Sequence, residues 1–287
     1  MKIGVITNCF GKTHKEGIEI AASLGLSGVQ IYATDGAFSP ATLTDAEKAE
    51  YKRLLSERGI VISALCADMG GFGFERAEDN PERIEKTKRI IDLAKEFGAV
   101  AVTTHIGVIP ADKTNPTYGV MLDALTEIGL YAKAAGVTMA IETGPEKAAT
   151  LLAFLKDTKG GVGVNLDPAN FTMVTNQDAV EAVYLLRDYI VHTHLKDGVL
   201  LDPNQDPADV YHAFAMGGVD ALNACRGFKE VPVGEGQVNW SAYIAALADI
   251  GYDGFLTIER ECGEDPVGDI THAAEYIKMF LKPCKNT

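Results

Sequence analysis

The sequence repeats one pattern along its length: an amphipathic segment with helical periodicity, then a glycine, then a short run of apolar residues. Glycine ends a helix well because it adopts the left-handed backbone conformation that other residues avoid. Apolar runs of this length are typical of strands that are buried in a sheet. Strands that alternate with helices in this way predict a parallel sheet with crossover helices.

The pattern predicts eight strands and eight helices. The strands are 2–8, 28–33, 60–66, 100–105, 137–142, 162–167, 190–194 and 254–259. The helices are 15–24, 44–59, 80–98, 115–136, 145–156, 177–188, 240–250 and 266–281. At about 36 residues per strand–helix pair, the 287-residue chain has the size of a closed barrel. We therefore predict an α/β fold, a single (β/α)8 TIM barrel that forms one domain over residues 1–287.

An open, doubly wound sheet is the alternative architecture for the same alternation. It is disfavoured because no GxGxxG motif follows the first strand and no change of composition marks a second domain. The irregular part of the pattern is residues 195–238, a long connection after the seventh strand that holds Tyr211 and His212. This connection is too long for a plain turn, and we expect a lid or an oligomer contact there.

Charge and composition exclude several classes of function. The net charge of −14 argues against nucleic acid as a partner, because the phosphate backbone attracts basic surfaces. The sequence has no run of about 18 apolar residues, so no membrane-spanning segment is expected. The chain starts with a predicted strand and lacks a signal peptide's apolar region and cleavage site. Its cysteines contain no CxxC pair, which favours reduced thiols and a cytoplasmic location; they are Cys9, Cys66, Cys225, Cys262 and Cys284.

Several predicted strands end in ionisable residues that share one face. Because successive side chains of a strand point to opposite faces, the branched apolar set should face the helices and the other set the barrel axis. In five strands the axis-facing set ends in an ionisable residue, namely His105, Glu142, Asp167, His194 or Glu259. These ends meet at the carboxyl-terminal face, where barrel enzymes hold their active sites. His192 faces the same way one layer deeper, and we expect it to hydrogen-bond beneath the site.

Three carboxylates in one pocket raise one another's pKa unless a positive charge compensates them. A single divalent cation is the simplest compensation, and three carboxylates with one imidazole make an oxygen-rich site. Such a site favours Mn²⁺, Mg²⁺ or Co²⁺, with Zn²⁺ as a further option. For each carboxylate taken alone, an ion pair with a lysine or arginine is the alternative explanation.

Three further residues are candidates for binding a substrate. His105 ends the fourth predicted strand, Asn170 follows the sixth, and Arg226 lies in the long connection. Binding residues concentrate on the loops above a barrel. The alternatives are that His105 packs the barrel and that Arg226 is an ordinary surface arginine. Lys196 and Asp197 are interpreted as a local ion pair in a loop.

Five segments of the chain carry a recognisable set of motifs: AIETG at 140–144, NLDPAN at 165–170, HTHLKD at 192–197, GEGQVNW at 234–240 and GFLTIE at 254–259. Together they resemble the xylose isomerase-like barrel superfamily, and more narrowly its sugar and sugar-phosphate isomerase/epimerase branch, which includes D-tagatose 3-epimerase-like enzymes. The match covers essentially the whole chain. It implies one divalent metal ion held by Glu142, Asp167, His194 and Glu259, with Glu142 and Glu259 as the acid/base pair.

The resemblance implies a metal-dependent isomerisation or epimerisation of a ketose or related sugar, with or without a phosphate group, by proton transfer through an enediolate. An inosose dehydratase-like lyase on the same metal site is the rival enzyme, and a sugar-binding protein without catalysis is a more distant alternative. The apurinic endonuclease branch is disfavoured, because it uses several zinc-binding histidines and this chain has Asn170 at one such position. The expected partner is a small sugar; a homo-oligomer is compatible with the sequence.

Two other positions bear on the substrate. Gln30 occupies the region where relatives often carry a glutamate near the end of the second strand. Gly234 and Gly236 offer backbone N–H groups to a phosphate, but Glu235 between them would repel it. We therefore expect an unphosphorylated sugar.

Overall fold

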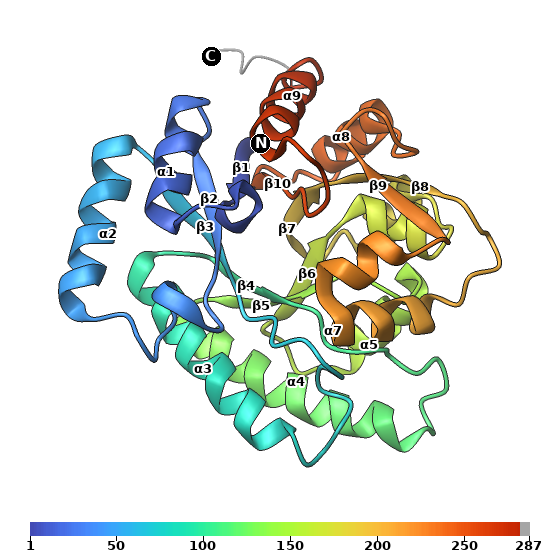
Figure 1. Ribbon diagram of the computed structural model, residues 1–287. Helices are drawn as coiled ribbons and strands as arrows, with labels where there is room; N and C mark the ends of the chain where they lie inside the picture. The colour runs from blue at the N-terminus through green and yellow to red at the C-terminus, as the bar shows by residue number, and fades with distance from the viewer. Residues whose placement is uncertain (282–287) are drawn as a thin grey trace.

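The computed structural model describes residues 1–281, with the side chains of Val219, Leu222 and Asn223 left aside, and shows a closed barrel (Figure 1). Cys284 lies outside the described residues. The barrel strands are β1 (Lys2–Ile6), β2 (Gly28–Tyr32), β3 (Val61–Cys66), β4 (Ala101–Thr104), β5 (Thr138–Glu142), β6 (Val162–Leu166), β7 (Ile190–Leu195) and β10 (Phe255–Ile258).

The strands follow one another around the barrel in chain order, and β10 closes the ring between β7 and β1. Each neighbouring pair is parallel. The predicted (β/α)8 barrel is confirmed. The open sheet is wrong, because β1 pairs with β10 from Lys2 opposite Phe255 to Val5 opposite Ile258. The first strand is shorter than predicted, since a short 3-10 helix at Thr7–Phe10 follows it.

Helices surround the barrel and cover the outer faces of its strands (Figure 1). They are α1 (His14–Ser23), α2 (Asp45–Arg58), α3 (Asn80–Phe97), α4 (Pro116–Ala135), α5 (Ala148–Asp157), α6 (Ala179–Leu186), α8 (Trp240–Asp249) and α9 (Pro266–Lys278). Gly59 and Gly136 end α2 and α4 with φ values of 64° and 78°, as the glycine pattern predicts. The helix α3 begins at Asn80 as predicted, and the Asn80 side-chain amide donates to the Phe74 carbonyl at 3.1 Å.

The segment 195–238 contains regular structure of its own. Its strands β8 (Asp197–Leu200) and β9 (Phe228–Val231) pair antiparallel, and α7 (Pro207–Ala224) lies between them in the chain. The backbone of Gly218 interrupts α7 with φ 60° and ψ −150°. The Ala215 carbonyl in α7 accepts a hydrogen bond at 3.1 Å from the N–H of Gly71, in the loop that follows β3. This contact holds α7 against the carboxyl end of the barrel.

The inside of the barrel is arranged in layers. Near its middle, Ala64, Ala101 and Ala140 form a small buried cluster that is separate from the main core between strands and helices. The next residues toward the carboxyl end on β6 and β7, Asn165 and His192, are buried and polar. The axis-facing set predicted from alternation is therefore confirmed. Within residues 1–281, none of the helices combines the length and hydropathy that a membrane crossing requires.

Candidate metal centre and active site

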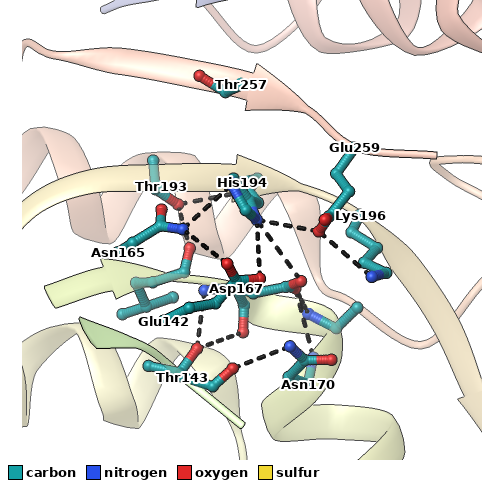
Figure 2. A network of polar contacts seen from close by, with 12 residues as sticks. Glu142, Thr143, Asn165, Asp167, Asn170, Thr193, His194, Lys196, Thr257 and Glu259 are labelled. Carbon is teal, nitrogen blue, oxygen red and sulfur yellow. Dashed lines mark hydrogen bonds and ion pairs between the residues drawn. The ribbon is translucent and has the colours of Figure 1, made fainter. Parts of the chain in front are cut away.

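Four side chains converge at the carboxyl end of the barrel (Figure 2). Glu142 ends β5, Asp167 follows β6 directly, His194 lies in β7, and Glu259 follows β10 directly. Each offers one ligand atom, and these atoms lie within 4.8 Å of one another. All four side chains are buried. The convergence predicted from strand alternation is present in the structure.

The Nδ1 atom of His194 faces three carboxylates at once. It lies 2.9 Å from Glu259 Oε2, 3.2 Å from Glu142 Oε1 and 3.9 Å from Asp167 Oδ2. One imidazole nitrogen donates at most one proton, so it cannot satisfy three acceptors. Asp167 Oδ2 and His194 Nδ1 are both buried without a well-oriented hydrogen bond. Buried polar atoms of this kind are normally paired, and a divalent cation among them would compensate the charges. The donor set therefore fits the predicted cation.

The opposite edge of His194 contacts two buried amides. Its Nε2 lies 3.1 Å from the amide oxygen of Gln30 and 3.0 Å from the amide nitrogen of Asn165, and the Gln30 amide nitrogen donates to Thr103 Oγ1 at 3.1 Å. Burial would lower the pKa of His194, but the charges of Glu259 and Glu142 raise it well above its usual value. A metal ion at Nδ1 would replace the proton there, and the hydrogen on Nε2 would donate to the Gln30 oxygen. Gln30 therefore supports the centre from beneath, a role that the sequence analysis missed.

A second polar layer lies under the four residues. The Nδ1–H of His192 donates to Asn165 Oδ1 at 2.8 Å, and its Nε2 accepts from Thr257 Oγ1 at 3.0 Å. Burial keeps the pKa of His192 well below its usual value, so the ring is neutral. Asn165 donates in turn to Glu142 Oε2 at 3.3 Å. The prediction that His192 hydrogen-bonds beneath the site is confirmed. Asn165 bonds both His192 and Glu142 and so links this layer to the site.

Backbone groups hold one oxygen of Asp167 and leave the other open. Oδ1 accepts from the N–H groups of Ala169 at 2.8 Å and Asn170 at 3.3 Å. The Asn170 side chain donates to the Thr143 carbonyl at 2.8 Å, which ties the loop after β6 to the loop after β5. Burial raises the pKa of the Asp167 carboxyl. The turn thus aims Oδ2 at the shared centre, and it places Asn170 at the edge of the cavity above.

The predicted ion pair between Lys196 and Asp197 is wrong, because Lys196 pairs with other carboxylates. Its Nζ lies 3.2 Å from Glu259 Oε2 and also contacts Glu261. Burial alone would raise the pKa of Glu259, but the charges of Lys196 and His194 hold it below its usual range. Lys196 is two positions after His194, so alternation was the available signal that both point the same way. The structure places the buried ammonium group of Lys196 beside the candidate metal centre, as Figure 2 shows.

His105 lines the cavity above the four residues, together with Asn170 and Lys196. Its Nδ1 lies 2.9 Å from Asp68 Oδ2, and its Nε2 lies 3.9 Å from Glu142 Oε1. Burial would lower the pKa of His105, but the charges of Glu142 and Asp68 raise it to about 10. Asp68, which follows β3, is a site residue that sequence reasoning missed.

Arg226 lies apart from this group. It is exposed in the turn before β9, and it is not among the residues that line the cavity. Its assignment to the substrate stays a prediction. The other two candidates for substrate contact, His105 and Asn170, are brought together at the cavity floor, and their roles toward a substrate are also predictions.

Known proteins share this architecture. The family model described as the xylose isomerase-like TIM barrel matches residues 18–280. Among curated proteins there was no match. Among solved structures, a xylose isomerase domain protein from Planctomyces limnophilus is similar, with 26% identity and a TM-score of 0.76 over 97% of this chain and 96% of that chain.

Two further similar structures have lower identity. The probable 3-DHS dehydratase AsbF from Bacillus anthracis has 20% identity and a TM-score of 0.77, over 97% of this chain and 99% of that chain. D-psicose 3-epimerase with D-tagatose, from Clostridium cellulolyticum H10, has 16% identity and a TM-score of 0.73, over 99% and 100%. At these identities the likeness shows the fold alone. The match of the family model over nearly the whole chain goes further: the chain belongs to the xylose isomerase-like TIM barrel family.

Proposed function

We propose that the protein is a sugar isomerase or epimerase that acts on a ketose or related sugar with one divalent cation. Glu142, Asp167, His194 and Glu259 would hold the cation. One observation carries the proposal: two of these ligands, Glu142 and Glu259, are carboxylates on β5 and after β10, and β6 and β7 separate those strands in the barrel. A substrate at the centre would therefore have one carboxylate on each side.

The two glutamates perform the proton transfer. One removes a proton from the carbon next to the substrate carbonyl, and the other returns a proton from the opposite side. Return to the same carbon inverts its configuration, and return to the neighbouring carbon isomerises the sugar. The cation, when bound, polarises the carbonyl and stabilises the negative charge of the enediolate oxygens. Mn²⁺, Mg²⁺ and Co²⁺ suit this oxygen-rich donor set best.

The surrounding residues prepare the glutamates and bind the sugar. Lys196 favours the ionised form of Glu259, which is the form that accepts a proton. Asn165 orients Glu142 through its amide. His105 presents Nε2 to the cavity because Asp68 holds Nδ1, and Asn170 borders the same space. Both would hydrogen-bond substrate hydroxyls.

Solvent exchange tests the proposal. With Mn²⁺ in D₂O, a ketose substrate should gain deuterium at the reacting carbon. Glu142→Gln and Glu259→Gln should each lower kcat by about 10² to 10⁴-fold, because each removes one proton carrier. Glu264→Gln, which changes an exposed glutamate close to Glu259 in the chain, is the matched control and should keep full activity. A Glu259→Gln protein that binds metal and turns over normally would contradict the assignment.

Product analysis separates this reaction from elimination, which the likeness to a probable dehydratase brings into view. A lyase on the same site would use a glutamate base but expel a hydroxyl, and an unsaturated carbonyl product absorbs in the ultraviolet. We expect products without that absorbance and with the mass of the substrate. Metal analysis of the purified protein addresses the sugar-binding alternative, since a binder without catalysis has no need of the four-residue centre.

A further inference from the structure

Each of the two proposed catalytic glutamates has a nitrogen-bearing neighbour. His105 Nε2 lies 3.9 Å from Glu142 Oε1, and Lys196 Nζ lies 3.2 Å from Glu259 Oε2. Both neighbours line the cavity above the candidate metal centre. In the proposed reaction His105 hydrogen-bonds a substrate hydroxyl, whereas Lys196 has only carboxylates of the protein as partners. The similar placement of the two side chains suggests that Lys196 also has a partner on the substrate.

The ammonium group of Lys196 has one more N–H than it has acceptors in the described part of the chain. A lysine ammonium carries three N–H groups. The acceptors among the described residues are Glu259 Oε2 and Glu261 Oε2. The Lys196 side chain is 5% exposed and borders the cavity, so the remaining N–H has the cavity as the space for its partner. Because buried donors are normally hydrogen-bonded, we expect that partner on the molecule that fills the cavity.

Glu261 holds the ammonium group at this position. Its carboxylate contacts Lys196, and it borders both the cavity with Lys196 and a second cavity, of about 470 Å³, that reaches Glu259. Glu261 belongs to no metal-ligand cluster among the described residues. A buried ion pair adds little stability over apolar side chains of the same volume. The stability of the fold therefore gives little reason for this pair, whereas buried charges of this kind are common at functional sites.

The proposed reaction develops negative charge close to Lys196. When a glutamate removes the proton from carbon, the C–H electron pair becomes part of a C=C bond and the carbonyl electron pair moves onto the oxygen. Return of a proton to carbon reverses these shifts, so the step needs no further reactant. Glu259 Oε2 contacts His194 Nδ1 at 2.9 Å and Lys196 Nζ at 3.2 Å (Figure 2). A substrate oxygen bound at the centre beside Glu259 would therefore lie within reach of the ammonium group.

We propose that Lys196 is a third catalytic residue, whose ammonium group donates a hydrogen bond to the substrate oxygen that becomes negatively charged, and that Glu261 positions it. The proposal rests on the proposed function, because it requires a substrate carbonyl at the centre. A cationic donor aimed at this oxygen stabilises the transition state more than the bound substrate. A Lys196 with a structural role alone would only balance the charges of the neighbouring carboxylates.

A charge-matched double variant separates these two roles. Lys196→Met alone leaves the carboxylates of Glu259 and Glu261 without their cation, so its defects would combine both roles. Lys196→Met together with Glu261→Gln removes one positive and one negative charge and keeps the volume of both side chains nearly constant. The double variant should keep the urea midpoint and the Mn²⁺ affinity of the wild type, since apolar replacement of a buried ion pair is often neutral.

Turnover of the Mn²⁺-loaded proteins is measured by deuterium exchange into the 2-ketohexose that the wild type exchanges fastest. The double variant should lose about 10² to 10³-fold in kcat with little change in KM, as expected when one donor to a developing negative charge is removed. Glu261→Gln alone keeps the ammonium group and should lose less. Lys229→Met, at an exposed position on β9, is the control and should keep full activity.

Inhibitor binding gives a readout without turnover. A sugar hydroxamate presents two adjacent oxygens with a negative charge, as the enediolate does, whereas the matching polyol has hydroxyls without that charge. Calorimetry should show that the double variant binds the hydroxamate about 10²-fold more weakly than the wild type, because ligands that resemble the transition state share its interactions. Both proteins should bind the polyol equally. Glu261→Gln should weaken the hydroxamate alone, to a smaller extent.

The outcomes are distinguishable. A double variant with wild-type kcat or wild-type hydroxamate affinity would assign Lys196 to charge balance and overturn the proposal, while the proposed function would stand. A double variant that lost its fold or its Mn²⁺ affinity would likewise overturn it, because Lys196 would then be needed to build the centre. If the wild type neither exchanged deuterium into any 2-ketohexose nor bound the hydroxamate, the proposed function itself would be wrong.

Discussion

Asp167 and Asp197 are two buried aspartates at the same end of the barrel, and their hydrogen bonds differ completely. Asp197 accepts four: from Gly198 and Val238 N–H at Oδ1, at 2.9 and 3.2 Å, and from Gly234 N–H and Trp240 Nε1–H at Oδ2, at 2.9 and 2.8 Å. Asp167 is bonded through Oδ1 alone, and its Oδ2 has no hydrogen-bond partner among the described residues.

We interpret the difference as that between a structural carboxylate and a proposed metal ligand. Four donors around Asp197 replace the water that burial removed, so the charge is stable in place and holds the loop before α8. The open oxygen of Asp167 has no such compensation from the described part of the chain. It faces other carboxylates and His194, so a cation bound among these groups would supply the missing compensation. Saturation of the acceptors is thus a physical criterion that distinguishes the two roles.

The same substitution should affect the two aspartates very differently. Asp197→Asn places an NH₂ group against N–H donors and should lower the free energy of unfolding by about 4 kcal/mol. Asp167→Asn keeps the bonded oxygen and removes a repelled charge, so the metal-free protein should change by less than about 1 kcal/mol. Urea unfolding with EDTA measures both. Equal losses at the two positions would refute the distinction.

Glu146 is a third buried carboxylate, after β5, with Oε1 unpartnered and no place in a ligand cluster among the described residues. Burial raises its pKa from 4.5 to about 7. The folded protein therefore binds more protons than the unfolded chain between these values, and its stability falls as the pH rises through that range. Glu146→Gln removes this loss.

The expected gain from Glu146→Gln is roughly 3 kcal/mol at pH 8, and it should vanish near pH 4. Unfolding by urea across this pH range measures it. Glu264→Gln, at an exposed position, is the control and should follow the wild-type curve. Parallel curves for wild type and Glu146→Gln would show that the unpartnered oxygen costs the fold nothing.

Addition of metal tests whether Asp167 is a metal ligand. Free Mn²⁺ at a hundred times its Kd should stabilise the wild-type protein by about 2.7 kcal/mol, since the cation binds the folded state alone. EDTA should reverse the gain. Asp167→Asn should lose most of it, whereas Glu146→Gln should keep all of it. A full metal-dependent gain in Asp167→Asn would remove that residue from the ligand set.

Of these changes, Gln30→Met should have the smallest effect. It retains the size of the side chain but loses the amide oxygen that holds His194 Nε2–H at 3.1 Å. Metal affinity should fall by about 10- to 100-fold, as for other residues that orient ligands from behind. Ser63→Ala is the control, because Ser63 contacts His192 rather than His194 and should change the affinity little. Competition with a fluorescent chelator measures both variants.

Much of the fold and of the centre is predictable because both depend on local periodicity. Glycines such as Gly59 mark where helices end, and alternation along each strand decides which side chains face the axis. Glu142 and Asp167 follow from that alternation, since equivalent ends of parallel strands meet in a barrel. These signals need only neighbouring residues, which a single sequence supplies.

The remaining parts depend on distant partners that a single sequence does not reveal. Gln30 contacts His194 across 164 positions, and Lys196 selects Glu259 across 63 positions rather than its neighbour Asp197. The helix α7 lies in the segment 195–238, which the sequence pattern presents as one long connection, and Gly218 breaks its backbone. Packing over the barrel, rather than local preference, stabilises such a segment.

The end of β7 performs three tasks within four consecutive residues. His194 and Lys196 face the proposed reaction centre, while Asp197 anchors the neighbouring loop. Their order depends on strict alternation, so one inserted residue would exchange the faces and send a charged side chain into the apolar layer. Evolution can therefore remodel the segment beyond Asp197 far more freely than the length of this short stretch, and a deletion scan should find indels tolerated beyond it but not within.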